Sequence, residues 1–352
     1  MLLAVFTCLA GAADTANIDA LMDSGHWKRA RAAAEALYKA NPNDAYANYC
    51  LARIGQSFDT IDEAVKHAEL AVKLDPKSSA YHRALGDVYS AQLDHVSKFK
   101  QFGIARQMRA EFETALALDP KNPENILNMI EYYIQAPGMF GGDKKKGHQM
   151  AEDEVKSNPA EGYLALAQIA IEEKEPAKLD SLLRKAVEGD PKNYGARISL
   201  ASSLANGAAK DFAQAEQQAA AAVQINPDRI GGYRWLAFAV ASQKRVDDAA
   251  KVIARAEAAV PDDLSPLVYA ARALLRQETE FPHAEAWLKK YLAETKEPEP
   301  GAPLIAGAHW SLGLVYEKEG RKPEAIAELE TAVRIKPDFE PAKKDLKRIS
   351  GK

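Results

Sequence analysis

A glycine-rich loop followed by lysines is the stretch of the sequence with the most distinctive binding chemistry. In residues 135–143, Gly141 and Gly142 come just before three consecutive lysines that begin a predicted helix. The first amide groups of a helix lack intrahelical acceptors and attract anions, and nearby lysines strengthen that field. The pattern is compatible with a weak anion-binding site at Gly141, Gly142, Lys144 and Lys145. The interpretation we favour is a turn that lets the second helix repack after an insertion.

Motifs of the familiar enzyme classes are absent from the sequence. It contains no HExxH, GxSxG, GxxxxGK[ST], GxGxxG or CxxC. The seven histidines show neither HxH nor HxxxH spacing, so a metal site would need residues from distant helices. We therefore expect a protein that is not an enzyme, with no catalytic residues, no metal and no cofactor.

Composition points to a helical protein with a continuous core. Hydrophobic residues make up 47% of the 352-residue chain and charged residues 27%, and alanine runs favour helix throughout. The formal net charge is −4. Because nucleic acids and anionic membranes attract a basic excess, neither is an expected partner.

The clearest structural pattern lies in residues 308–337. A first helix carries Leu312, Gly313 and Tyr316 on one face, a glycine breaks the helix, and a second apolar series ends at Pro337. Small residues stand where the two helices must cross closely. The pattern predicts a helix hairpin.

The same hairpin recurs along the chain. Leu-Ala or Leu-Gly pairs mark the first helices, and an alanine stands five residues before most of the prolines that end the second helices. Those prolines are Pro42, Pro76, Pro120, Pro159, Pro191, Pro227, Pro261 and Pro337. The spacing predicts about nine helix pairs.

These residues resemble the tetratricopeptide repeat (TPR) of a bacterial, exported type, with the loop at 135–143 similar to a feature of a group of bacterial members. The resemblance implies an all-α fold, an α-solenoid of about nine TPR-like hairpins with a C-terminal capping helix near 339–349. One departure is that His309 occupies the usual aromatic position and Trp310 follows it. We place Trp310 on the open face of the array rather than in its core.

Two repeats are longer than the rest. The third has ten extra residues within 90–108, where one glycine and no proline predict a helical extension. The fourth has five extra residues in the loop 135–143. Repeats extend over residues 13–296, a proline-rich connection follows at 297–303, and residues 304–352 form the last repeat and the cap.

The N-terminal segment is short and apolar. Residues 1–12 end in Ala10-Gly11-Ala12, which is typical of a signal-peptide cleavage site, although no basic residue precedes the apolar run. The segment is too short to span a membrane. We expect a periplasmic or secreted protein without membrane insertion, with a cytoplasmic one as the alternative.

The resemblance also implies where a partner binds, because first helices line the concave face of such arrays. Aromatic and arginine side chains are enriched at binding hot spots. The residues that the register places there are Tyr46, Tyr49, Arg53, Arg83, Asp87, Leu127, Glu131, Arg234, Phe238, Arg272, Arg276 and Trp310. Arg234, Arg272 and Arg276 make the far half basic and suited to an acidic peptide or a carboxylate terminus.

The leading hypothesis is a non-catalytic scaffold that binds a peptide or protein segment in this groove. The runner-up is an accessory protein that binds a small anionic ligand at residues 135–146. The sequence identifies neither the partner nor the oligomeric state.

Overall fold

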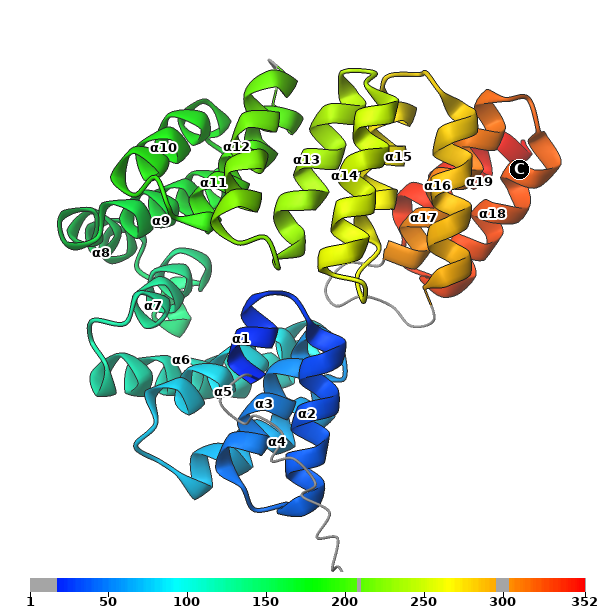
Figure 1. The fold of residues 1–352 in the computed structure, drawn as a ribbon. Coiled ribbons are helices and arrows are strands. Elements are labelled where there is room, and N and C mark those ends of the chain that lie inside the picture. The colour runs from blue at the N-terminus through cyan, green and yellow to red at the C-terminus, as the bar shows by residue number, and fades with distance from the viewer. Residues whose placement is uncertain (1–17, 208–209, 296–303, 352) are drawn as a thin grey trace, which may run out of the picture.

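The computed structural model describes residues 18–207, 210–295 and 304–351. Within these ranges every regular element is a helix (Figure 1). The first helices of the hairpins are α1 (Ile18–Asp23), α3 (Ala45–Ser57), α5 (Ser79–Gln92), α7 (Pro123–Gln135), α9 (Pro159–Glu172), α11 (Tyr194–Asn206), α13 (Ile230–Ser242), α15 (Ser265–Arg276) and α17 (Leu304–Lys318). The second helices are α2 (Trp27–Ala40), α4 (Ile61–Leu74), α6 (Lys98–Leu118), α8 (Lys144–Ser157), α10 (Pro176–Gly189), α12 (Phe212–Ile225), α14 (Val246–Ala259), α16 (Phe281–Glu294) and α18 (Lys322–Ile335). A final helix, α19 (Glu340–Ser350), packs against α18.

The hairpins stack into a solenoid, as predicted. Each first helix packs against its own second helix, and α11, α13, α15 and α17 also contact one another in sequence. The alanines five residues before the helix-ending prolines are buried in these contacts. They are Ala71, Ala115, Ala186, Ala222, Ala256 and Ala332, each at most 1% exposed. Small side chains at these crossings let the helices approach closely.

Glycine has a similar function where the last hairpin crosses. A Cβ atom on Gly313 would lie 2.9 Å from the Leu329 side chain, too close for an undistorted contact. Leu312 and Tyr316 beside it are 2% and 4% exposed. The predicted register of the last repeat is therefore correct.

In several first helices a polar side chain occupies the position where the repeat usually has an aromatic residue. These polar side chains form hydrogen bonds with the turn that precedes their helix. The contacts are Asn48 Nδ2 to the Pro42 carbonyl at 2.9 Å, His82 Nε2 with the Pro76 carbonyl at 3.0 Å, and Arg197 Nε to the Pro191 carbonyl at 3.1 Å. Each spans six residues. The contact ties one hairpin to the next by satisfying a carbonyl that a helix end would leave without a partner.

The two long repeats differ from the prediction in one respect. The first helix α5 ends at Gln92, a 3-10 turn η2 (Leu93–His95) follows, and the extra length lies at the start of α6. The predicted helical extension is therefore correct for the start of α6, and η2 and residues 96–97 interrupt it. The loop 135–143 is non-helical as predicted, apart from the 3-10 turn η3 (Gly138–Phe140).

The array curls until its first hairpin touches the turn that follows the seventh. In Figure 1 the blue α1 and α2 lie below α13 and α14. Asp262, in the turn between α14 and α15, accepts from Arg29 Nη2 at 2.9 Å and lies 3.2 Å from His26 Nδ1. The solenoid therefore closes on itself at this point.

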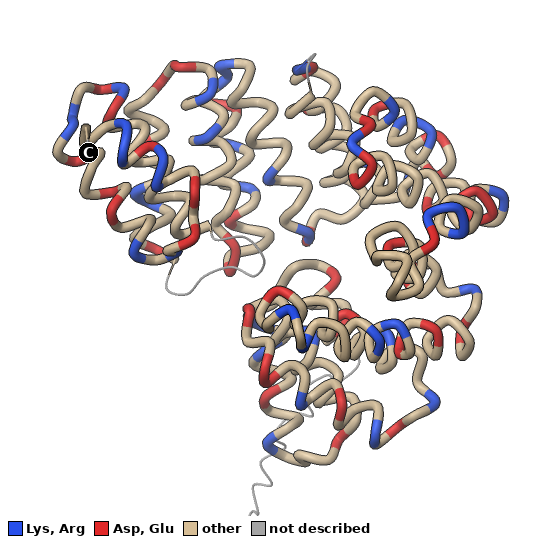
Figure 2. The backbone as a smooth tube through the Cα atoms, turned by 180° about the vertical axis from the view of Figure 1, so that it is seen from behind, with Lys and Arg blue, Asp and Glu red and all other residues tan. Residues whose placement is uncertain are grey.

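The predicted signal segment 1–12 and the connection 297–303 lie outside the described residues. No helix in the described part of the chain is both long and apolar enough to cross a bilayer. Lysines and arginines are interspersed with acidic residues over much of the described array (Figure 2).

Candidate functional site

The inner face of the array encloses a large hollow near the C-terminal end. Its volume is about 880 Å³. α15, α17 and the capping helix α19 form its walls. The lining side chains that matter most are Arg272, Arg276, Trp310, Ser311, Leu314 and Phe339. The hollow thus combines cations with aromatic and aliphatic surface.

Arg272 is the most unusual group in this hollow because no carboxylate of the described residues pairs with it. Its Nε donates to Ser311 Oγ at 3.2 Å, and its side chain is half-buried. Burial lowers the pKa of Arg272, and neighbouring Arg276 lowers it further. A partly desolvated guanidinium without a counter-ion favours binding of an anion.

The backbone of α17 is shaped to receive this guanidinium. A Cβ on Gly307 would lie 2.2 Å from Arg272 Nη2, so any larger residue at this position would displace the guanidinium from its present place. Ser311 is fully buried and donates to the Gly307 carbonyl at 2.7 Å while accepting from Arg272. Two residues of the next first helix therefore fix the position of Arg272.

Arg276 lies one turn along α15 and is exposed. Its Nη1 donates to Asn206 Oδ1 at 2.8 Å, and its guanidinium lies 5.2 Å from the centre of the Phe238 ring. Neither partner is an anion, so Arg276 keeps its charge available to the groove.

Trp310 lies on the open face, where it borders the hollow. Its Nε1 donates to Asp345 Oδ2 of α19 at 2.8 Å, and its ring centre is 5.8 Å from that of Phe339. The capping helix thus completes this part of the groove and orients the indole. The sequence placed Phe339 at the start of the capping helix and not in the groove, whereas in the structure it precedes α19 and borders the hollow.

The groove continues toward the middle of the array. A second hollow, of about 750 Å³, lies along α9, α10 and α11, and Trp235 of α13 closes its end. Asn206 and Arg276 border the space between the two hollows. Trp235 packs edge-on to Phe238 and Tyr269, with ring centres 5.6 and 5.4 Å away. Sequence reasoning missed Trp235, whose only signal was an aromatic residue directly before the core pair Leu236-Ala237.

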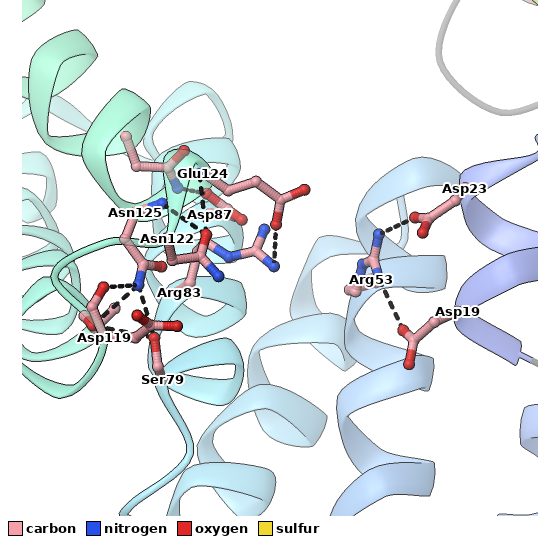
Figure 3. A network of polar contacts seen from close by, with 12 residues as sticks. Asp19, Asp23, Arg53, Ser79, Arg83, Asp87, Asp119, Asn122, Glu124 and Asn125 are labelled. Atoms are coloured by element: carbon pink, nitrogen blue, oxygen red, sulfur yellow. Dashed lines mark hydrogen bonds and ion pairs between the residues drawn. The ribbon is translucent and has the colours of Figure 1, made fainter. Parts of the chain in front are cut away.

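At the near end of the groove, the predicted binding residues bond to the protein itself (Figure 3). Arg53 Nη1 donates to Asp19 of α1 at 3.0 Å and to the Tyr49 hydroxyl at 2.9 Å. The Tyr46 hydroxyl also donates to Asp19, at 3.0 Å. Tyr49 is 5% exposed, and burial raises its pKa to about 12. These side chains hold α1 against α3.

Arg83 and Asp87 form a second internal network beside the first (Figure 3). Arg83 Nη2 lies 2.5 Å from Glu124 Oε2, and Asn128 Nδ2 donates to Asp87. Burial raises the pKa of Asp87 to about 6, although Arg83 and Asn128 oppose the shift. Burial also raises the pKa of Glu131 on α7. This part of the inner face is therefore acidic, and most of its charged groups already bond to other groups of the protein.

Two predicted residues of the far half are structural as well. Arg234 Nη2 lies 2.6 Å from Asp263, and its Nε donates to Ser265 at 2.5 Å. Phe238 is only 4% exposed. The basic character predicted for the far half therefore resides in Arg272 and Arg276, because Asp263 neutralises Arg234.

The glycine-lysine loop uses its own groups to satisfy the start of α8. The amides of Gly141 and Gly142 bond to the Gly138 and Pro137 carbonyls at 3.0 and 3.2 Å. Asp143 caps the helix by accepting from the Lys146 amide at 3.0 Å. A carboxylate of the chain therefore already occupies the place at the helix end that a small anion would take.

The glycines of this loop serve its geometry. Gly141 has a φ of +92°, and a Cβ on Gly142 would lie 1.7 Å from the Ala136 carbonyl oxygen. Lys144 lies 3.5 Å from Glu173. These contacts favour the turn interpretation over the anion site at Gly141, Gly142, Lys144 and Lys145.

Among the described residues, no three His, Cys, Asp or Glu side chains lie close enough together to hold a metal ion. Several histidines instead bond to nearby side chains. His82 and His309, at equivalent positions of two first helices, lie 2.5 and 2.6 Å from Glu111 and Glu328 of their second helices.

Two segments of the chain match the sequence model of a known family, described as tetratricopeptide repeat. They are residues 15–79 and 270–338, which include the first two and the last two hairpins. No curated protein matches the chain.

Several solved structures resemble the array. A thermophilic TPR protein of Thermus thermophilus is 21% identical with a TM-score of 0.46, over 54% of this chain and 96% of that one. Yeast Tom70 is 14% identical with a TM-score of 0.48, over 95% of this chain and 87% of that one. The Cut9–Hcn1 hetero-tetramer of the APC/C is 14% identical with a TM-score of 0.47, over 96% of this chain and 76% of that one.

Proposed function

We propose that this chain, in which two segments match the tetratricopeptide-repeat model, is an interaction scaffold that binds an acidic peptide segment in the far half of its inner groove. The observation that carries the proposal is Arg272, a half-buried guanidinium that borders an 880 Å³ hollow and pairs with no carboxylate of the described chain. A carboxylate from a partner would supply the missing counter-ion.

The surroundings of Arg272 determine what else the partner needs. Trp310, Leu314 and Phe339 give the same hollow an apolar wall. Aromatic side chains held in place by the protein gain contact area at low entropic cost. We therefore propose a segment with an acidic group flanked by apolar side chains.

The length of the groove favours an extended or helical peptide over a small molecule. Arg276 and Asn206 connect the terminal hollow to the one that Trp235 closes, so a segment held at Arg272 can continue along α13 and α11. Salt should weaken the arginine contribution and leave the aromatic one nearly unchanged.

A peptide-array experiment tests the proposal. The purified protein is applied to peptides of varied sequence with free C-terminal carboxylates, to the same peptides as C-terminal amides, and to versions with acidic side chains neutralised. We expect captured peptides to contain acidic and apolar groups. Amidation separates a terminal carboxylate from a side-chain carboxylate as the recognised group.

The variants Arg272→Gln and Arg276→Gln supply the decisive comparison. Arg334 lies exposed near the end of α18, so Arg334→Gln is the matched control for loss of one positive charge. We expect Arg272→Gln to weaken capture at least about tenfold, the usual loss when a partly desolvated charge-assisted contact is removed. Equal capture by Arg272→Gln and Arg334→Gln would exclude this site.

A further inference from the structure

The two insertions of the array meet in space, although neither belongs to the inner groove proposed above. The extra residues at the start of α6 and those of the loop 135–143 border one hollow of about 490 Å³. The ring centres of Phe102 and Phe140 are 4.9 Å apart across this junction. The Tyr132 hydroxyl donates to the Phe140 carbonyl and so fixes the loop to α7. We call the surface formed by residues 96–110 and 135–149 the insertion surface.

The insertion surface exposes large apolar side chains. Phe99 is 97% exposed, Met139 78% and Phe102 51%, and elsewhere in the described chain only Ile171, at 53%, is comparably exposed among the large apolar residues. Phe99 and Phe102 are three residues apart on α6 and therefore share a face of the helix. Apolar groups gathered in this way mark interaction sites.

The same surface is basic within an acidic protein. Residues 96–110 contain Lys98, Lys100, Arg106 and Arg109 and no acidic residue, a net charge of +4. Residues 135–149 contain three lysines and Asp143, a net charge of +2. Since the whole chain carries −4, the remainder carries −10 against the +6 of the insertion surface.

Several of these cations have no acidic partner. The side chains of Lys98, Lys100, Arg106 and Lys145 form no ion pair with any described residue, whereas Arg109 lies 2.8 Å from Glu113 and Lys144 3.5 Å from Glu173. Free positive charge beside exposed phenylalanines is the combination that inserts into the interface of an anionic bilayer.

We propose that the insertion surface is a peripheral membrane-binding site for anionic lipid. Phe99, Phe102 and Met139 enter the boundary between head groups and acyl chains, and the free lysines and arginine contact the phosphates. At 97% exposure Phe99 has almost no contact with the protein, so no shaped pocket surrounds it. A fluid lipid partner needs no such complementary shape, whereas a protein hot spot usually lies in a packed pocket.

This site is distinct from a membrane span and from the Arg272 hollow. Sequence reasoning expected no attraction to membranes because it considered the net charge of the whole chain. The described helices include none that could span a bilayer, and interfacial binding requires none. Arg272 and its hollow lie on other helices, and the two hollows share no lining residue.

Vesicle flotation with the full-length protein tests the proposal. The probes are vesicles of phosphatidylcholine alone and of phosphatidylcholine with phosphatidylglycerol. We expect binding to the anionic vesicles, weakening as salt rises, and little binding to the neutral ones. Equal binding to both vesicle types, or binding to neither, would overturn the proposal.

Paired variants separate the apolar and the charged contributions. We expect Phe99→Ala with Phe102→Ala, and separately Lys98→Gln with Lys100→Gln, each to reduce vesicle binding at least about tenfold, since each removes two interfacial groups. The matched controls are Ile171→Ala, another exposed apolar residue, and Lys121→Gln with Lys192→Gln, two exposed lysines outside the surface.

Phe99→Trp provides a variant that should retain binding. We expect it to float with anionic vesicles as the wild type does, and its added fluorescence to be quenched by brominated acyl chains. Circular dichroism confirms that each variant is folded. If the alanine variants bind vesicles like their controls, the surface does not bind lipid, and if they instead lose a protein partner, it is a protein-docking site.

Discussion

Arginine side chains line both ends of the inner groove, but they have different partners at the two ends. Near the N-terminus, Arg53 and Arg83 bond to Asp19 and Glu124 of the chain. Near the C-terminus, Arg272 has the Ser311 hydroxyl as its partner and no carboxylate among the described residues. Arginine on a concave face is therefore a binding residue only where the protein leaves it without a counter-ion, because a satisfied guanidinium gains little from a second anion.

The largest effect on stability that we expect comes from replacing a core residue of the last hairpin, compared with replacing a neighbouring groove residue. Leu312→Ala should lower the free energy of unfolding by about 2–5 kcal/mol, because Leu312 is 2% exposed between α17 and α18. Trp310→Ala should cost less, since the indole borders the hollow. Chemical denaturation of both variants checks the order, and the reverse order would show that Trp310 belongs to the core.

The next largest effect is a pH dependence of stability that we expect from Asp87. Its pKa is raised to about 6, so the folded state binds a proton more tightly than the unfolded state does. Stability is therefore lost as pH rises from the unfolded pKa of about 4 through 6, and the loss persists above it. Asp87→Asn should remove this slope and raise the free energy of unfolding at pH 8 by about 1–3 kcal/mol.

Denaturation of wild type and Asp87→Asn at pH 4, 6 and 8 provides the measurement. Asp247→Asn is a suitable control, since that carboxylate lies exposed in the first turn of α14. Parallel profiles for wild type and Asp87→Asn would mean that the Asn128 and Arg83 contacts outweigh burial.

The most direct test of the difference between the two ends of the groove replaces one arginine at each end and compares the stability of the two variants. Arg53→Ala removes the cation that pairs with Asp19, leaves the hydrogen bond from Tyr46, and should destabilise the protein by about 1 kcal/mol, a value limited by the exposure of Asp19. Arg272→Ala removes a desolvated cation and breaks no ion pair with a described residue, so it should cost no more than the hydrogen bond to Ser311. Equal losses of stability in the two variants would remove the distinction between the two ends.

The fold could be predicted from the sequence because the same pattern of residues recurs in each repeat. The alanines before the prolines and the Leu-Gly or Leu-Ala pairs fix helix faces locally, and the structure confirms both at Ala332 and Leu312. The start of α6 was harder to predict, because the helix break at η2 involves neither proline nor glycine.

For the groove, the sequence predicted which residues lie on the concave face, but not which of them are free to bind a partner. Register placed Arg234 and Arg272 alike on the concave side, but the acidic partner of Arg234 lies 29 residues away, in the next turn of the solenoid. Whether a guanidinium finds a carboxylate depends on contacts between repeats, which the pattern of one repeat does not contain. The insertion surface was missed for the same reason, since its two halves belong to different repeats.

The smallest effect concerns the contact that closes the array, which sets how far the two ends of the groove are apart. Burial raises the pKa of Asp262, but the hydrogen bond and charge of Arg29 outweigh it, so the pKa lies below its usual value. The contact therefore stabilises the closed form at neutral pH and is lost as pH falls through that pKa. Asp262→Asn should cost only about 0.5–1 kcal/mol, the worth of a partly exposed ion pair. Small-angle scattering at pH 7 should nevertheless report a larger radius of gyration for Asp262→Asn than for Asp228→Asn, an exposed control in another inter-hairpin turn. An unchanged radius would show that packing of Gly25 against Ile230 holds the ends together without the ion pair.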